Sequence, residues 1–485
     1  MNRLLKILLL AVIVAANAAR LWNLDADFPS GLTWEGSPYT DEGQYASGAI
    51  AYLTTGQWYL EGDINAMISV PVFHLVQAFA LKLMGFGLVS ARMAEVLFFL
   101  VIVLCVYVLV RRYADASTAL VATVLLSVNF TLFAYSRLAI TELPTVSIGL
   151  GSIVLALSWP HRNDFLIGGL AAGLMFLAYL TKASALLLLP VLLYASAVRK
   201  THLKDQIYAA RWVLFVFTGL LSLYHAIMNY LYHEEYAYFS SRVFLSRFSL
   251  HPLAILANLP RTLCNGIFLD DLMYLLTLPL LFCPVFLLVS RKYQENPLVT
   301  LCYLWLFSFF AAMSACRYQP PRYYLTLSVP VTILFSVIAV LLYRMLKSLW
   351  WAYLPLVLIG LIALTNVAKI ADYLQQPKYS FLAMSQDVLQ RITLEQVPNP
   401  LLLGSIANSI SLATGLPSLN DGLGVRDLRW KLARYQPTHY IVLGIGQETL
   451  ALLNEFYQIS QLAVYDVFGN YYGGQKVYFY KLTKR

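Results

Sequence analysis

The chain of 485 residues is 59% hydrophobic and only 12% charged, and its mean hydropathy is +0.66. No ordinary soluble domain is this apolar, so the composition predicts a membrane protein. The formal net charge of +9 does not predict nucleic-acid binding, because no basic stripe with interleaved aromatic residues occurs.

Apolar runs long enough to cross a bilayer recur along most of the chain. A helix of about 20 residues spans a hydrocarbon core of roughly 30 Å, and about eleven runs approach that length. They lie near residues 4–19, 90–110, 116–135, 138–158, 165–181, 183–198, 212–231, 272–290, 298–315, 323–343 and 349–368. We therefore predict an all-α polytopic membrane protein with about 11 transmembrane helices.

Positive charges in the short loops predict the orientation of these spans, because cytoplasmic loops retain Lys and Arg. The basic residues that fall on one side are Arg3, Lys6, Arg111, Arg112, Arg162, Arg199, Lys200, Lys204, Arg211, Arg291, Lys292, Arg344 and Lys347. That side is predicted to be cytoplasmic and to hold the amino terminus. After an odd number of spans, the carboxyl terminus lies outside. The expected location is the plasma (inner) membrane of a bacterium.

The first span has a second interpretation. Arg3 and Lys6, the apolar run and Ala16-Asn17-Ala18 together are also typical of a secretory signal peptide with its cleavage site. Trp22 favours a retained helix, because Trp anchors helices at the membrane interface. In either case the loop that follows is external.

Two stretches in the first external loop, 20–88, have helical character. The segment from Glu42 to Leu53 has apolar residues at helical spacing, which predicts a helix lying on the membrane. Residues 64–84 are apolar but interrupted by Pro71 and several polar residues. They predict a surface or re-entrant helix, with a twelfth span as the alternative. A second part outside the bilayer covers 232–271.

The tail is predicted to form a separate α/β domain. Leu401–Gly404 and Tyr440–Gly444 are short apolar runs that end in glycine, as buried strands do, and 462–467 and 476–482 predict two further strands. Helices are predicted near 380–392, 426–435 and 447–458. Alternating strands and helices favour an α/β layer. We therefore expect a transmembrane domain at 1–368 and an extracytoplasmic α/β domain at 369–485.

Ionisable residues gather on the predicted external face. They are Asp41, Glu42, Arg137, Glu142, Lys182 and Arg322. Charges at membrane depth are costly and tend to mark substrate paths. Carboxylates placed where the membrane meets water suit proton abstraction from a hydroxyl. The Asp41-Glu42 pair is therefore the leading candidate for the chemistry.

These residues resemble a known family, the dolichyl-phosphate-mannose protein mannosyltransferases and bacterial aminoarabinose transferases of the GT-C glycosyltransferase class. The resemblance spans most of the chain and rests on the order of several short motifs. They are Asp41-Glu42, Gly56-Gln57-Trp58, Gly87 to Arg92, Ser136-Arg137 to Glu142, Gly168-Gly169 with Gly173 running into Thr181-Lys182, and Arg322-Tyr323.

The resemblance implies a membrane glycosyltransferase that moves a sugar from a polyprenyl-phosphate donor to a hydroxyl acceptor on the external face, with inversion. The acceptor would be a lipid, a glycan or a protein. Asp41 would be the general base, and Glu42 would position the acceptor or a metal. The residues that would bind the donor phosphate and substrate are Arg137, Glu142, Lys182, Arg322 and Tyr323.

Two points stay open beside this resemblance. A divalent cation held through the oxygens of Asp41, Glu42 and Glu142 is an alternative that no spacing rule demands. Many family members carry a basic residue and consecutive prolines in the first loop, where this chain has Asn65 to Pro71. That departure argues against transfer of aminoarabinose to lipid A and leaves the acceptor undetermined.

Each candidate residue also has a purely structural interpretation. Asp41 and Glu42 also suit the first turn of a helix, where acids complement the helix dipole. Arg137 with Glu142 fits an interfacial ion pair or snorkelling side chains. Lys182 fits a helix-end anchor and Arg322 a turn cation.

Two other classes of protein compete with the transferase. A transporter or flippase is the main alternative, but transporters usually hold ionisable residues near the bilayer midplane and in repeated halves. Here the midplane is nearly free of charge, and no repeat is visible. A scaffold that recruits partners with its external tail is the second alternative. It would not require Asp41.

Overall fold

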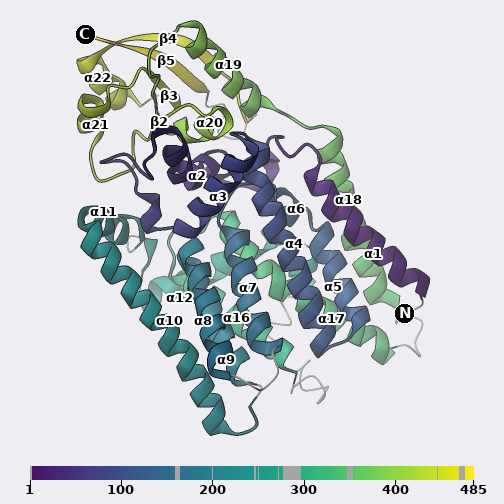
Figure 1. Cartoon of the computed structure of the whole chain (residues 1–485). Helices are drawn as coiled ribbons and strands as arrows, with labels where there is room; N and C mark the ends of the chain where they lie inside the picture. The colour runs from purple at the N-terminus through teal and green to yellow at the C-terminus, as the bar shows by residue number, and fades with distance from the viewer. Residues whose placement is uncertain are drawn as a thin grey trace.

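The structure is a computed structural model that describes residues 3–158, 164–198, 200–244, 247–249, 251–270, 272–276, 296–346, 353–444, 446–468 and 476–485. Long helices form the body of the molecule, and a small sheet with its own helices lies at one end of that body (Figure 1). The predicted fold class, a polytopic helical protein with a C-terminal α/β part, is confirmed.

Six helical stretches among the described residues are long and apolar enough to cross a membrane. They are Arg3–Leu21, Leu88–Tyr113, Leu203–Leu231, Pro297–Ala315, Pro321–Met345 and Leu354–Leu394. Shorter apolar helices occupy most of the other predicted spans, and the predicted span at 272–290 lies mostly outside the described residues. The chain is thus a multi-pass membrane protein.

The helices of this body have the following bounds. They are α1 Arg3–Ala18, α2 Ser37–Thr55, α3 Pro71–Met84, α4 Leu88–Tyr113, α5 Ala116–Val128, α6 Phe130–Tyr135, α7 Glu142–Ser158, α8 Asp164–Thr181, α9 Leu189–Ala197, α10 Leu203–Leu231, α11 His233–Tyr238, α12 Pro252–Asn265, α16 Pro297–Ala315, α17 Ser328–Leu346 and α18 Leu354–Gln375. Short 3-10 segments are η1 Ala19–Leu21, η2 Ser30–Leu32, η3 Ala66–Ile68, η4 Ala183–Leu188, η7 Gly266–Leu269 and η8 Pro321–Leu327, and a π-helical turn, η5, covers Phe239–Phe244.

The predicted span at 116–135 consists of two helices, and a polar side chain caps the start of each. Asp115 caps α5 by accepting the backbone N–H groups of Ser117 and Thr118, at 2.8 and 3.1 Å. At the break itself, the Asn129 side chain accepts the Leu132 N–H at 2.8 Å. Helix ends leave unpaired N–H groups, and side-chain oxygens satisfy them here. The chain can therefore stop and restart a helix in an apolar surrounding.

Similar breaks set where the ionisable residues lie. Residues 136–141 are not helical, so α7 begins at Glu142 rather than near 138. Lys182 stands between α8 and η4 with extended backbone, at φ −165° and ψ 135°. Arg322 lies in η8, just before α17. Helix ends, not helix interiors, therefore carry Glu142, Lys182 and Arg322.

The first loop forms α2 and α3 at the end of the bundle that faces the sheet (Figure 1). The predicted helix from Glu42 is confirmed as part of α2, which ends at Gly56, where φ is +79° and glycine is strongly favoured. Helix α2 packs against α3 and against α20 of the C-terminal part, so it is covered by protein. Helix α3 has 14 residues, fewer than the about 20 that a crossing requires.

The C-terminal part has a five-stranded sheet in the order β2-β1-β3-β5-β4. Strand β1 is parallel to β2 and β3, while β5 is antiparallel to β3 and β4. The elements are α19 Ser380–Leu394, β1 Leu402–Leu403, α20 Ala407–Thr414, β2 Ser418–Leu419, α21 Leu428–Tyr435, β3 His439–Leu443, α22 Gln447–Phe456, β4 Tyr457–Tyr465 and β5 Val477–Lys484. The predicted strands and helices are all present, and α20 and β2 are additions that the sequence patterns did not reveal.

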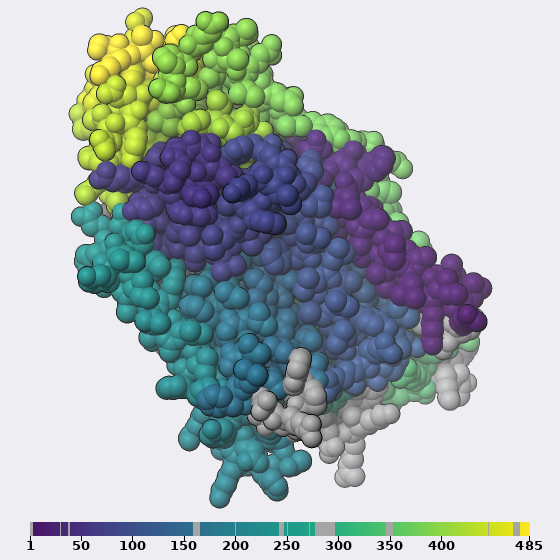
Figure 2. Space-filling model, in the orientation of Figure 1, coloured from purple at the N-terminus to yellow at the C-terminus, as the bar shows by residue number. Residues whose placement is uncertain are grey.

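The C-terminal part packs directly on the first loop, as the space-filling view shows (Figure 2). Gly43 of α2 meets the backbone of Asn408 and Ser409 of α20, and no Cβ atom would fit there without movement. The Ser409 hydroxyl donates to the Thr40 carbonyl at 3.1 Å. Because glycine allows this approach, α20 lies directly against the turn of α2 that carries Asp41 and Glu42.

Candidate active site

Arg322 stands at the centre of a buried charge cluster built from separate segments. Its Nη2 lies 3.1 Å from Asp41 Oδ2, and its Nε lies 3.2 Å from Glu142 Oε1. Its Nη1 pairs with Glu35 Oε1. Arg322 is 5% exposed, so these ion pairs are largely shielded from water and strengthened by the low dielectric.

Lys182 brings a second cation to the same cluster. Its ammonium group pairs with the Glu142 Oε1 atom and lies 4.7 Å from the ring centre of Tyr323 and 5.6 Å from that of Tyr45. A cation over an aromatic face is attracted by the ring quadrupole. The structure therefore brings together five of the predicted site residues, namely Asp41, Glu142, Lys182, Arg322 and Tyr323.

A cavity of about 460 Å³ opens beside this cluster. Glu142, Lys182 and Tyr323 line one part of its wall. Much of the remaining wall is apolar and includes Leu186, Leu187, Phe239, Phe248, Phe309 and Met313. A chamber with charged groups at one place and apolar side chains elsewhere suits an amphipathic ligand.

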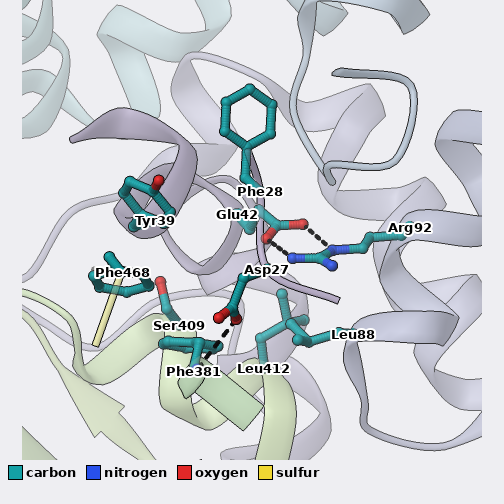
Figure 3. A pocket seen from close by; sticks show the side chains of 10 residues that line it. All are labelled: Asp27, Phe28, Tyr39, Glu42, Leu88, Arg92, Phe381, Ser409, Leu412 and Phe468. Carbon is teal, nitrogen blue, oxygen red and sulfur yellow. Dashed lines mark hydrogen bonds and ion pairs between the residues drawn. The ribbon is translucent and has the colours of Figure 1, made fainter. Parts of the chain in front are cut away.

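Glu42 points away from this cluster, although it follows Asp41 directly. Its two carboxylate oxygens accept from Nε and Nη2 of Arg92, at 2.8 and 2.6 Å. Figure 3 draws both contacts as dashed lines. Oε1 also accepts the Ala139 N–H at 2.8 Å. Arg92 in turn donates to the carbonyls of Leu24 and Ala26. The Glu42–Arg92 pair holds α2 against α4 and the first loop, so in this geometry Glu42 positions α2. The predicted catalytic role of Glu42 stays a prediction.

Asp27 anchors the C-terminal part in the same region. It lies near Glu42 and Arg92 in the close-up (Figure 3). Its carboxylate accepts the Ser380 N–H at 2.8 Å, the Ser380 hydroxyl at 2.6 Å and the Phe381 N–H at 3.1 Å. Those groups belong to the first turn of α19, where an acid satisfies unpaired N–H groups. The small hollow that these side chains surround, about 10 Å³, has no room for a substrate.

Arg137 also lies outside the cluster. Its guanidinium donates to the carbonyls of Trp22, at 2.6 Å, and Asn23. It lies over the rings of Phe133 and Tyr373, at 5.3 and 5.2 Å from their centres. These contacts tie the residues after α1 to α6 and α18. The structure does not bring Arg137 to the other predicted phosphate-binding residues.

Three residues of the site were not predicted from the sequence. Two of them had a signal in the sequence. Glu35 precedes the Asp41-Glu42 pair in the same loop, and Tyr45 lies one helical turn after Asp41 and therefore on the same face of the helix. Arg247 had no such signal. Residues around Phe248 pair with those around Cys316, and this pairing brings Arg247 to the cavity, with its Nη1 3.1 Å from the Tyr323 hydroxyl.

Burial changes the acidity of the groups on α2, which lies outside the membrane-spanning helices. Loss of water around Asp41 raises the pKa of its carboxyl above the usual value, and the nearby Arg322 guanidinium opposes that rise. Burial likewise raises the pKa of the Tyr45 phenol to about 12. A carboxylate with a raised pKa is a stronger base, which suits the removal of a hydroxyl proton.

The carboxylates do not fit a metal site as they stand. Asp41 and Glu142 are both paired with Arg322, and Glu42 is paired with Arg92. No group of three His, Cys, Asp or Glu side chains among the described residues could hold a metal ion. Protein cations therefore already balance the charge of these carboxylates.

Comparison with known proteins shows which family model and which solved structures this chain is similar to. Residues 69–225 match the family model described as dolichyl-phosphate-mannose-protein mannosyltransferase. No protein in a search of curated sequences matches the chain.

Solved structures match nearly the whole chain. ArnT from Cupriavidus metallidurans bound to undecaprenyl phosphate is 15% identical, with a TM-score of 0.63 over 98% of this chain and 97% of that chain. Its apo state is 14% identical, with a TM-score of 0.64 over 97% of each chain.

An archaeal protein shares the fold more distantly. The oligosaccharyltransferase AglB from Archaeoglobus fulgidus, in complex with an inhibitory peptide and a dolichol-phosphate, is 10% identical, with a TM-score of 0.55. The match covers 98% of this chain and 74% of that chain. The predicted resemblance is thereby confirmed: the chain has an ArnT-like GT-C fold, and its residues 69–225 match the family model of the mannosyltransferases.

Proposed function

We propose that this membrane glycosyltransferase transfers a sugar from a polyprenyl-phosphate-linked donor to a hydroxyl acceptor on the external face of the membrane, with inversion. The observation that carries this proposal is the position of Asp41, which lies in a cluster with Arg322, Glu142 and Lys182 beside an apolar cavity. The related structures support the donor class, since one holds undecaprenyl phosphate and another a dolichol-phosphate.

Asp41 acts in this proposal as the general base. It takes the proton of the acceptor hydroxyl as the oxygen attacks the anomeric carbon, and the bond between that carbon and the phosphate oxygen breaks. The polyprenyl phosphate leaves with the electron pair of that bond. Attack opposite to the leaving group inverts the anomeric centre. No general acid is needed, because nearby cations can stabilise the negative charge of the leaving phosphate, so it departs without being protonated.

Cations at the cavity provide that neutralisation. Lys182 and Arg247 both line the cavity, so their side chains are placed to meet a phosphate at its charged part. Arg322 is engaged by Glu35, Asp41 and Glu142, so a phosphate would compete with three carboxylates for it. We propose that Arg322 holds Asp41 in place and balances the negative charge of the cluster. Its predicted contact with the donor phosphate is a second role in this proposal.

The experiment is a turnover assay of purified protein with a panel of polyprenyl-phosphate sugars and hydroxyl acceptors, following release of the carrier. Asp41→Asn removes the base with little change in volume, so we expect the rate to fall by on the order of 10²–10⁴-fold. Asp466→Asn makes the same chemical change at an exposed position and should leave the rate unaltered.

Other outcomes separate the alternatives. Full activity of Asp41→Asn would remove Asp41 from the role of base. Movement of lipid or solute across vesicles containing the protein, without release of carrier from any donor, would instead support a transporter or flippase.

A further inference from the structure

A buried cation outside the Arg322 cluster joins the C-terminal part to the first loop. Lys431 of α21 is 0% exposed, and its ammonium group donates to Asp63 Oδ1 at 2.8 Å. It also donates to the carbonyls of Asn420, at 2.7 Å, and Leu423. An ammonium group has three hydrogens, so all three are used. A buried charge with this many partners fixes the segments that supply them.

The partners of Lys431 lie on two segments far apart in the sequence. Asp63 belongs to the first loop, and its Oδ2 accepts the Asn420 N–H at 3.2 Å. The Asn420 side chain then accepts the N–H groups of Gly422 and Leu423, at 2.9 and 2.8 Å, which folds residues 420–424 into a tight loop. We call this segment the 420–424 loop.

Glycines hold the 420–424 loop close to the first loop. Gly424 has a φ of +121°, and a Cβ atom there would meet the Gly62 carbonyl and the Asp63 backbone. The same Gly62 carbonyl accepts the Arg426 N–H at 3.1 Å. The backbones of the two segments therefore lie against each other next to Asp63.

The segments fixed in this way each supply part of the cavity wall. Ile64 follows Asp63 and lines the cavity, and so does Leu423 of the 420–424 loop. Phe239, which also lines it, follows Tyr238, and the Tyr238 hydroxyl accepts the Gly424 N–H at 3.3 Å. The loop thus connects the first loop with the segment that contains α11 and η5.

We propose that the Asp63–Lys431 ion pair holds the 420–424 loop as a wall of the lipid cavity, so that the C-terminal part takes a direct part in binding the lipid-linked donor. Lys431 and Asp63 are positioning residues in this view, and Leu423 is the residue that contacts the lipid. The inference rests on the proposed function, because it assumes that a polyprenyl phosphate occupies the cavity.

A photo-crosslinking experiment tests the contact. A photoreactive benzoylphenylalanine replaces Leu423 in one variant and Leu187, another residue of the cavity wall, in a second. Each purified protein is irradiated with radiolabelled undecaprenyl phosphate. We expect both positions to label. Labelling at 187 but not at 423 would overturn the inference and leave the lipid cavity in place, whereas labelling at neither would overturn the cavity as well.

Substitutions at the ion pair test the positioning role. Lys431→Met leaves Asp63 buried without its cation, which can also destabilise the fold. The double variant Asp63→Asn with Lys431→Met leaves no lone charge, so it keeps the test valid if the single variant does not fold. Arg429→Met is the control, because Arg429 lies on the same helix but pairs with Glu455 at the surface.

We expect the double variant to raise KM for the lipid-linked donor about tenfold while kcat stays within about threefold, and to lose most of the label at position 423. The control should keep both values. Unchanged KM and labelling in the folded double variant would overturn the positioning role. A protein that labels at both positions but transfers no sugar from any donor would contradict the proposed function and not this inference.

Discussion

Asp41 and Glu42 are neighbours in the sequence and serve different parts of the structure. Successive residues on a helix point about 100° apart, so both cannot face one site. Asp41 contacts Arg322 beside the cavity, and Glu42 contacts Arg92 from a different face of α2. The helix periodicity therefore separates a candidate base from a positioning residue within a single acidic pair.

Substitution of Glu42 is expected to affect stability before chemistry. Glu42→Gln leaves the buried Arg92 without its anion, and removal of one partner from a buried pair costs about 3–5 kcal/mol. We expect a marked fall in the thermal stability of the purified protein, measured in detergent by loss of the folded state on heating. Glu42→Gln combined with Arg92→Met should recover part of it, because no lone charge remains. Equal stability of Glu42→Gln and the wild type would contradict this assignment.

The raised pKa of Asp41 predicts a pH dependence for transfer. Only the ionised carboxylate can accept a proton, and burial favours the neutral form, so the rate should rise with pH through a pKa above the usual value. The check is kcat/KM measured against pH, which reports the groups of the free enzyme. An acid limb at or below about pH 4, the ordinary value for Asp, would argue against Asp41 as the base.

At the scale of elements, the contact of α2 with α20 decides where the candidate base lies. Helix α2 is covered by α3 on one side and by α20 on another, and Gly43 allows the closest approach. The Asp27 cap on α19 and the Ser409 bond to Thr40 fix the same interface. The C-terminal part thus supports the helix that carries Asp41, whereas Glu35, Asp41 and Glu142, the carboxylates paired with Arg322 described above, belong to the helical body.

Gly43→Ala tests this contact. The added methyl group would meet the backbone of α20, which cannot move as a flexible side chain would. Overpacking of this kind costs about 1–3 kcal/mol, so we expect lower thermal stability and a lower transfer rate. Gly173→Ala is the matched control in a helix, because a Cβ atom at Gly173 meets nothing within 4 Å. A Gly43→Ala protein as stable and active as this control would show that the contact is not tight.

At the scale of the whole molecule, the site lies at the end of the helical bundle that the C-terminal part covers (Figure 1). The charges of Asp41, Glu142, Lys182 and Arg322 come from helix ends at this end of the bundle. A substrate with an apolar chain and a charged head would have its chain among the apolar residues of the cavity and its head at the cluster. The orientation predicted from the loop charges puts this end outside the cytoplasm.

Cysteine labelling tests that orientation in intact cells. Ser460→Cys on β4 and Thr201→Cys before α10 are at exposed positions, and Cys264→Ser removes the one native thiol that is exposed among the described residues. Cys283→Ser removes the cysteine that lies outside the described residues. A membrane-impermeant maleimide should label position 460 from outside and position 201 only after permeabilisation. The reverse pattern would overturn the predicted sides, and labelling of both positions in intact cells would contradict a single orientation.

The sequence by itself determined the class of the protein and identified five of the residues that meet at the site. Hydrophobic runs of membrane length, the alternating strands and helices of the tail, and the order of short charged motifs predicted the polytopic fold, its α/β part and the GT-C resemblance. These features are local, because burial in lipid and strand formation depend on composition and periodicity. Five of the predicted site residues lie together because each stands near a helix end or in a loop at the same end of the bundle.

Only the tertiary structure decided which charges pair with which. Glu42 and Arg137 were predicted for the site, but partners 50 residues or more away in the sequence hold them elsewhere. Arg247 reaches the cavity because its segment pairs with residues near Cys316, and Lys431 reaches Asp63 because the C-terminal part folds back on the first loop. Such contacts depend on how separate elements pack. No local pattern contains them, because the partner of a buried charge is set by which side chain lies within a few ångströms in the folded chain.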